Sequence, residues 1–441
     1  AEASILIDDL PDFHGTVSGL GEASGPNGST TPPPNYLDLT GVDFTDNPTI
    51  TYSDGVITVS DAGSQIGTIA VTDVPSGAYL NFTKDANGGT EVFFSDMVCF
   101  VAGTNLLTPT GTVAVETLSA GDQVIAVVDG QRVSRPIKWV GYRKLDLSRQ
   151  SDSLAPVRIK RGAMAEGLPT RDLLVSPPHC MFIDGKLIPA KLLVNDMTIV
   201  RDTTLKVVEY YHIELDHHAV IVAEGVESES YLDTGNRAFF SNAGLALILH
   251  PEFHVNAGLR CWETDACAPL AVSPAAVMPV WRQLADRAVA LGFVPPARAT
   301  TKEADLHLIA DGRRIDSIAV AGKTHSFMVP AGVTALVLAS RSAAPSTLAA
   351  YHDDPRELGV AVTRVVMRGQ AARVDFAADH PALAQGWHGM EQANGAMWRW
   401  TTGQAALPVG AVDGPVVVEV TVAATTTYLI EEAPADGRLA A

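Results

Sequence analysis

The sequence reads Val98-Cys99-Phe100-Val101-Ala102-Gly103-Thr104 where a polar segment rich in Gly, Ser and Thr gives way to a dense series of short strand-like runs. The cysteine in this stretch has two interpretations. It is either a small buried side chain, as most single cysteines are, or a nucleophile that attacks the peptide bond before it. A nucleophile needs partners elsewhere in the chain, because the amide nitrogen must gain a proton and the transient oxyanion must be stabilised.

The bulk composition describes a globular protein of about two to four domains. Of its 441 residues, 46% are hydrophobic and 18% are charged. The 31 Lys and Arg against 50 Asp and Glu give a net charge of −19, which argues against nucleic acid as a partner because that requires a basic surface. No apolar run reaches the roughly 18 residues of a membrane span. The polar segment has the composition of bacterial secreted or cell-surface proteins, so we expect export, with a cytoplasmic location left open.

The distribution of turn residues predicts a mostly β protein in five segments. Residues 1–35 are rich in Gly, Ser, Thr and Pro and predict a flexible leader. Period-two alternation then predicts strands through most of the remaining chain. The other four segments are a small β-rich module (36–98), an all-β domain (99–240), a partly helical connector (241–300) and a β-sandwich-like domain (301–441).

The connector contains the one long helix that the sequence predicts. Apolar residues recur at helical spacing over 274–291, including Val277, Val280, Trp281 and Leu284. We expect this face to pack against a core.

A second run, Arg171-Asp172-Leu173-Leu174-Val175-Ser176-Pro177-Pro178-His179, supplies groups that self-cleavage would use. It places a hydroxyl and an imidazole three residues apart. The two prolines between them restrict the backbone, so both side chains can be directed at one peptide bond. A third run, 211–231, contains Asp216 and His218, which either orient such a site or end a strand.

Together the three runs resemble the blocks of a Hint domain, the self-processing module shared by Hedgehog C-terminal regions and inteins, and fit best the bacterial Hedgehog/intein-like group. The resemblance covers about 97–240 and implies an all-β, horseshoe-like fold. It also implies that Cys99 attacks the carbonyl carbon of Val98 and that His179 acts on the scissile nitrogen. Ser176 stands where the family has Thr and is expected to hydrogen-bond nearby.

The function expected from this resemblance is autocatalytic cleavage of the Val98–Cys99 bond, a single-turnover reaction rather than ordinary enzyme turnover. An N-to-S acyl shift forms a thioester, with the chain's own N-terminal segment as substrate. Water or an amine on another protein then resolves it. Inteins end in His-Asn, whereas this chain has Glu229-Ser230 and continues, so we expect no splicing. The Cys and His spacings do not match a zinc site, and we expect neither metal nor cofactor.

The C-terminal segment supports a rival hypothesis. Trp387, Trp398 and Trp400 would suit stacking on sugar rings or, equally, the core of a β-sandwich. The alternative function is therefore a surface or carbohydrate-associated binding protein with an inactive Hint domain. Cys261 and Cys267 are close enough in sequence to pair, or are separate thiols.

Overall fold

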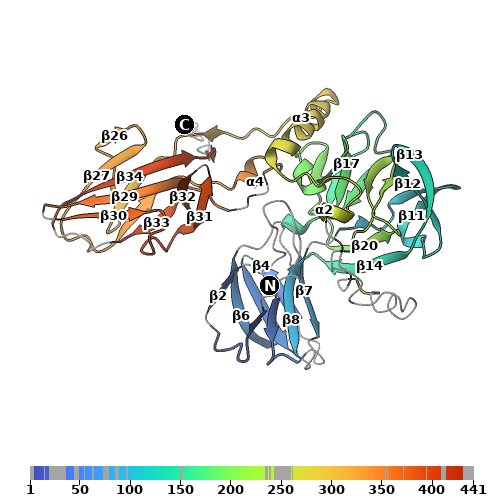
Figure 1. Cartoon of the computed structure of the whole chain (residues 1–441), viewed down its shortest axis with the longest axis horizontal. Coiled ribbons are helices and arrows are strands. Elements are labelled where there is room, and N and C mark those ends of the chain that lie inside the picture. Colours follow the sequence, from blue (N-terminus) through green and yellow to red (C-terminus); the bar gives the residue numbers. More distant parts are fainter. Residues whose placement is uncertain are drawn as a thin grey trace, which may run out of the picture. The chain divides into compact units, whose positions relative to one another are not determined.

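The computed structural model describes most of the chain and divides it into two compact units, Ala1–Pro295 and Pro296–Ala441 (Figure 1). The described residues are 4–13, 15–18, 36–43, 49–53, 55–61, 64–72, 79–84, 89–95, 98–148, 152–233, 237, 240–242, 260, 262–352, 354, 356–370, 372–393, 395–408 and 414–430. They are mostly β, as the sequence predicts. Within these ranges, no helix combines the length and the apolar character needed to cross a membrane.

The first part of unit 1 contains two four-stranded sheets around one apolar core. One sheet has the order β1 (Ser4–Leu6), β3 (Tyr36–Leu39), β8 (Thr90–Ser95) and β7 (Tyr79–Lys84). The other has the order β2 (Thr16–Ser18), β6 (Ser64–Thr72), β5 (Val56–Asp61) and β4 (Thr49–Ser53).

The prediction of a flexible leader over 1–35 is wrong for residues 4–18. Strands β1 and β2 pair in parallel with β3 and β6. Ile7, Leu10 and Val17 are buried in the core of these sheets. The polar composition of the segment conceals these few apolar residues, whose burial fixes the backbone around them. Residues 19–35 lie outside the described part of the chain.

The second part of unit 1 contains two larger sheets and three short 3₁₀ turns, η2 (Val115–Thr117), η3 (Asp152–Leu154) and η4 (Ala190–Leu193). One sheet has the order β11 (Gly111–Ala114), β10 (Asn105–Thr108), β21 (Val220–Ala223), β22 (Val226–Glu229), β17 (Cys180–Ile183) and β18 (Lys186–Pro189), with β12 (Gln123–Val128) on β21 and β13 (Gln131–Pro136) on β12. The other has the order β14 (Trp139–Asp146), β20 (Val207–Glu214), β9 (Phe100–Val101), β16 (Leu173–Val175), β15 (Val157–Ile159) and β19 (Ile199–Arg201).

Helix α3 (Pro274–Ala290) confirms the predicted helix but packs on this β domain instead of standing apart as a connector. Val277 and Leu284 are buried along one face. The Trp281 indole N–H donates a 2.7 Å hydrogen bond to the Val194 carbonyl, just after η4. Arg287 Nε donates 2.8 Å to the Gly162 carbonyl. A shorter helix, α2 (Trp262–Asp265), precedes it.

Unit 2 is the β-sandwich that the sequence predicts. One sheet has the order β25 (Arg313–Ile315), β24 (His307–Ala310), β28 (Leu336–Ala339) and β33 (Gln404–Leu407). The other has the order β26 (Ala319–Ala321), β27 (Thr324–Val329), β34 (Val416–Thr425), β29 (Val360–Arg368), β32 (Ala396–Thr401) and β31 (Trp387–Ala393), with β30 (Arg373–Ala377) on β29. A small pair, β23 (Thr300–Thr301) with β35 (Tyr428–Leu429), and helix α4 (Pro345–Leu348) complete the unit.

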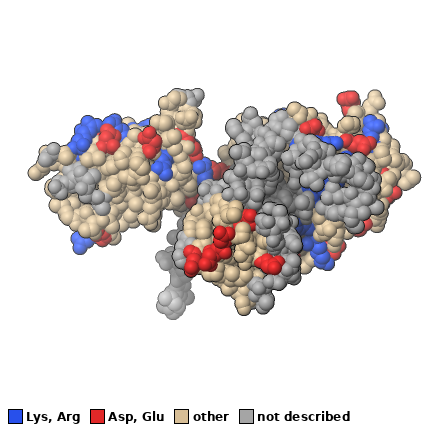
Figure 2. All heavy atoms as spheres, turned by 60° about the horizontal axis from the view of Figure 1, so that its bottom comes forward, with Lys and Arg blue, Asp and Glu red and all other residues tan. Residues whose placement is uncertain are grey.

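The sandwich core draws on both sheets, with Leu308 and Leu338 from one and Phe327 and Val418 from the other. Alternate residues of β24 and of most of β34 are buried, which is the period of two that the sequence shows. On the face that Figure 2 draws, acidic and basic side chains are interspersed and uncharged residues cover most of the described surface.

Candidate active site

The two-residue strand β9 positions the predicted nucleophile. Phe100 in β9 pairs with Val175 of β16 on one side and with Tyr211 of β20 on the other, both antiparallel. Because register in an antiparallel pair advances residue by residue, Cys99 lies opposite Ser176 on the first side. On the second side it lies opposite His212.

Cys99 and Ser176 are joined by two hydrogen bonds. The Cys99 backbone N–H, which belongs to the Val98–Cys99 peptide bond, donates 2.8 Å to Ser176 Oγ. The Ser176 N–H donates 2.9 Å to the Cys99 carbonyl. Both residues are fully buried, whereas Val98 is half-buried. The serine hydroxyl thus contacts the nitrogen at which cleavage would occur.

A tight turn carries His179 back toward the same region. The His179 N–H donates 3.1 Å to the Ser176 carbonyl across Pro177 and Pro178, whose rings restrict the turn. The strand that follows, β17, starts directly at Cys180. The turn keeps the two residues close in the backbone, and the direction of both side chains at one peptide bond stays a prediction.

The His179 ring is buried against aromatic neighbours. Its centroid lies 4.3 Å from that of Phe100 and 5.4 Å from that of His212. The His212 ring in turn lies 5.4 Å from the Tyr231 ring. Neither nitrogen of His179 has a hydrogen-bond partner among the described residues, and the same holds for His212 Nε2. Buried imidazole nitrogens are normally bonded, so these free donors and acceptors are available for chemistry.

Burial keeps the groups of this site uncharged. It raises the pKa of the Cys99 thiol well above its ordinary value, an effect that Arg143 opposes and Glu229 reinforces. It also lowers the pKa of His179 to about 3, with a further contribution from His218. Burial likewise lowers the pKa of His212. At neutral pH the site therefore holds a protonated thiol and neutral imidazoles.

The two residues predicted from the third run are separated. His218 is buried, and its Nε2 lies 3.5 Å from Glu229 Oε2. Asp216 is exposed, and its backbone carbonyl accepts a 2.8 Å hydrogen bond from Arg260. The structure does not bring the Asp216 side chain into the buried group around Cys99.

Sequence reasoning missed two buried residues of this region. His212 was not selected as a site residue, although it sits in the third run. Glu229 enters the sequence argument only as part of the pair that stands where inteins have His-Asn, yet its Oε1 accepts a 2.6 Å hydrogen bond from the Cys180 N–H. Both residues lie on strands whose apolar sequence predicts burial. Burying an ionisable residue costs free energy unless the residue has a role, and this signal could have identified both.

The three tryptophans of unit 2 occupy different environments. Trp387 is 7% exposed, belongs to the sandwich core, and donates its indole N–H to the Ala406 carbonyl at 3.0 Å. This environment is the core-packing one of the two interpretations, and a role of Trp387 in ligand binding stays a prediction. Trp398 and Trp400 are half-buried, and Trp398 donates to Glu391 Oε2 at 3.1 Å. Their predicted role in ligand binding stays a prediction.

The remaining cysteines are thiols in the described residues. Cys180 is buried and its Sγ donates to the Pro178 carbonyl at 3.6 Å, whereas Cys267 is exposed. Cys261 lies outside the described residues, so its pairing with Cys267 stays open. No three or more His, Cys, Asp or Glu side chains gather as a metal site in the part of the chain that the structure describes.

Comparisons with known proteins assign the second part of unit 1. The chain is similar to a solved bacterial intein-like domain from Clostridium thermocellum, with 21% identity over 31% of this chain and 100% of that one, at a TM-score of 0.24. It is also similar to a DnaB intein from Synechocystis sp. PCC 6803, with 13% identity over 31% of this chain and 99% of that one, at a TM-score of 0.22. No curated protein is significantly similar to the chain. The sequence model of the Hint domain family matches residues 98–235, and this part of the chain is therefore a Hint domain.

Proposed function

We propose that the Hint domain cleaves its own chain at the Val98–Cys99 bond, by an N-to-S acyl shift without splicing. The observation that carries this proposal is the 2.8 Å hydrogen bond from the Cys99 N–H to Ser176 Oγ. It holds the scissile nitrogen beside a hydroxyl, on the turn that also carries His179.

The first step moves one proton from the Cys99 thiol to His179 and then from His179 to the Cys99 nitrogen. Cys99 Sγ bonds to the Val98 carbonyl carbon while the thiol proton passes to the neutral imidazole of His179. His179 then gives this proton to the Cys99 nitrogen, and the C–N bond breaks to leave a thioester and a free amine. Ser176 Oγ orients the nitrogen and stabilises its N–H groups as charge develops. A thiol with a raised pKa needs such a base, since little thiolate exists at neutral pH.

The second step releases the N-terminal segment. Water attacks the thioester carbonyl to form a carboxylate at Val98 and restore the Cys99 thiol, or an amine on another protein takes the acyl group as an amide. Both balance without a cofactor. The cleavage assay below detects release of the N-terminal segment whatever the acyl acceptor and the cell-surface location are.

The end of the Hint domain supports a single cut. Inteins end in His-Asn, where this chain has Glu229 and Ser230. Glu229 accepts the Cys180 N–H, and Ser230 Oγ accepts the Ala219 N–H at 2.9 Å. Both residues are thus bonded within the β domain, and neither offers the side-chain amide that cyclises when an intein cuts its second junction.

The test is cleavage of the purified full chain, followed by intact mass with and without dithiothreitol. Cleavage after residue 98 of 441 leaves 441 − 98 = 343 residues in the second fragment. Thiol should accelerate the appearance of both fragments, Cys99→Ala should abolish them, and His179→Ala should slow them. His325→Ala, in β27 of unit 2, is the matched control and should cleave at the wild-type rate.

Three results would overturn the proposal. They are a wild-type chain that stays whole under every condition, cleavage that survives Cys99→Ala, or a ligated product that joins residues on both sides of the domain. A whole chain would favour the binding-protein alternative. That alternative is tested by glycan-array binding of the full chain, which should be lost in Trp398→Ala if the half-buried tryptophans hold a sugar.

A further inference from the structure

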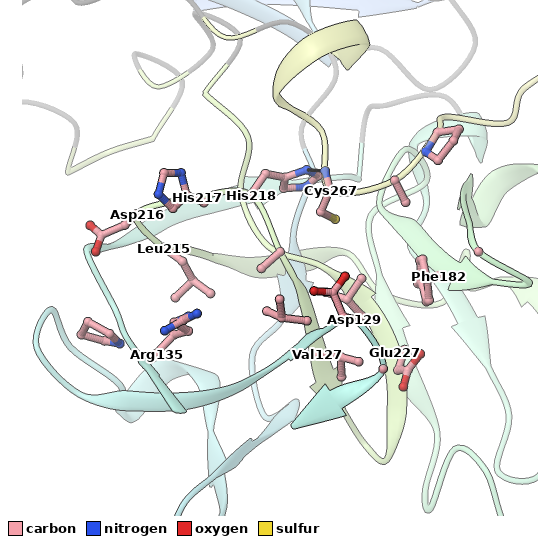
Figure 3. Close-up of a pocket in the computed structure, with 18 residues that line it drawn as sticks. Val127, Asp129, Arg135, Phe182, Leu215, Asp216, His217, His218, Glu227 and Cys267 are labelled. Carbon is pink, nitrogen blue, oxygen red and sulfur yellow. Dashed lines mark hydrogen bonds between the residues drawn. The ribbon is translucent and has the colours of Figure 1, made fainter. Parts of the chain in front are cut away.

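A second cysteine lies in line with a histidine and a carboxylate. The Cys267 N–H is 3.1 Å from His218 Nδ1, and His218 Nε2 is 3.5 Å from Glu229 Oε2. Figure 3 shows the Cys267 side chain beside the His218 ring, with its sulfur on the side of a cavity. The Trp262 ring packs edge-on against His218, with centroids 5.7 Å apart, and limits its rotation.

The cavity gives this group access to a ligand. It has a volume of about 890 Å³ and is lined by both Cys267 and His218. Cys267 is exposed, while the His218 side chain is fully covered. The thiol is therefore the reachable member, and the imidazole behind it is held in a fixed position. This access differs from that of Cys99, which is fully buried and does not line the cavity.

The His218 ring contacts Cys267 on one side and Glu229 on the other. Nδ1 accepts the Cys267 N–H, whereas Nε2 has no hydrogen-bond partner among the described residues and lies 3.5 Å from Glu229 Oε2. Burial alone would lower the pKa of His218, but its interactions with Cys267 and Glu229 raise it to about 9. Protonation of Nδ1 replaces the bond from the Cys267 amide, and the charged ring keeps the Glu229 contact and can give its proton to a leaving group.

We propose that Cys267, His218 and Glu229 form a second nucleophilic centre that accepts acyl groups from carboxylic esters or thioesters. The thiolate of Cys267, paired with the charged His218 ring, bonds through Sγ to the substrate carbonyl carbon. The bond to the alcohol or thiol leaving group breaks, and His218 gives its proton to that group. Water then hydrolyses the acyl-Cys267 thioester to the acid and the free thiol. Glu229 acts as a positioning residue that holds the imidazole.

The lining of the cavity indicates the kind of acyl donor. Its apolar wall includes Phe182 and Leu215, which suit an uncharged acyl chain. Asp129, Asp216 and Glu227 outnumber Arg135 among its charged residues, so the cavity repels anionic donors. We therefore expect neutral esters to react faster than negatively charged ones of equal leaving-group quality.

The test uses the full chain with Cys99→Ala, so that the first nucleophile cannot contribute and the result does not depend on cleavage. The probe is p-nitrophenyl acetate, followed by release of p-nitrophenol and by peptide mapping. We expect a burst with the acetyl group on Cys267, and none after Cys267→Ala. His218→Gln should slow acylation by about 100-fold, the usual contribution of a general acid.

Glu229→Gln tests the positioning role of Glu229. It keeps His218 in place, so the result does not depend on whether a His218 variant folds. Its amide can still accept the Cys180 N–H, but it no longer attracts a charged His218. Acylation should slow, and the alkaline limb of its pH profile should move to lower pH, because His218 loses an interaction that raises its pKa. The titratable groups that interact with His218 are Cys267, Glu229 and the neutral rings of His179 and His212.

Glu224→Gln is the matched control, because Glu224 is also buried in the Hint domain but pairs with Arg171. It should leave acylation of Cys267 unchanged. Acetyl groups spread over lysines, a Cys267 that reacts no faster than free N-acetylcysteine, or equal rates in Glu229→Gln and the parent would each overturn the proposal. A Cys267 found in a disulfide with Cys261 would also overturn it.

Discussion

Cys99 and Ser176, 77 residues apart in sequence, exchange two hydrogen bonds, and one of them engages the nitrogen of the Val98–Cys99 peptide bond. Removing the hydroxyl with Ser176→Ala leaves that buried N–H without its acceptor, at a cost of about 1–3 kcal/mol in the free energy of unfolding. We expect slower cleavage as well, because the nitrogen loses its orientation. Urea unfolding and the cleavage time course measure the two effects.

Ser176→Thr is the control for this change, since it keeps the hydroxyl and restores the residue type of the Hint family. Ser176→Thr should cleave clearly faster than Ser176→Ala. Equal rates for serine, threonine and alanine at this position would remove Ser176 from the mechanism.

The pKa of His179 makes a prediction about pH and stability. The unfolded imidazole gains a proton near pH 6.5, whereas the folded one stays neutral until about pH 3. The unfolded state therefore binds more protons in this window, and the stability that His179 contributes is complete above pH 6.5 and is lost as pH falls, by about 1.4 kcal/mol per pH unit. In a Cys99→Ala background, His179→Gln should show a shallower loss between pH 6.5 and 5.

Urea unfolding at several pH values checks this slope. The same low pKa means that protonation of His179 does not limit the cleavage rate between pH 6 and 8. A cleavage profile with an inflection near pH 6.5 that disappears in His179→Gln would contradict the neutral imidazole.

Phe100 supports the buried rings next to the nucleophile. It is fully buried, and its ring is the neighbour of both His179 and His212. Phe100→Ala should cost about 3–5 kcal/mol of stability and should reduce cleavage, because His179 loses the surface that positions it. Phe327→Ala is the matched control, since Phe327 is equally buried in unit 2. It should destabilise that unit and leave the cleavage rate unchanged.

Helix α3 should contribute to the stability of the Hint domain. Trp281→Phe keeps the aromatic ring but removes the indole N–H that bonds to the Val194 carbonyl. We expect a loss of about 1 kcal/mol in the unfolding of unit 1. Calorimetry with resolved transitions measures it, and Trp398→Phe in unit 2 should leave the unit 1 transition in place. If Trp281→Phe leaves the unit 1 transition unchanged, this hydrogen bond does not couple α3 to the domain.

Local pattern was sufficient for many elements. Strands β12, β15 and β16 are short runs rich in apolar and β-branched residues, which local pattern predicts as strands. Helix α3 was predicted for the same reason at helical spacing. Strand β13 has no such pattern, since most of its residues are exposed, and only its hairpin pairing with β12 defines it.

The sequence by itself determined the candidate nucleophile and its first partners, since the residue types and spacing of Cys99, Ser176 and His179 resemble the Hint blocks. Only the tertiary structure decided what surrounds them. Strand β9 has two residues and no period of its own, and its pairing with β16 and β20 depends on contacts between distant parts of the chain. Those long-range pairings place His212 across from Cys99 and His218 between Glu229 and Cys267. Local propensity carries no information about them, because register between distant strands is set by the packing of the whole domain.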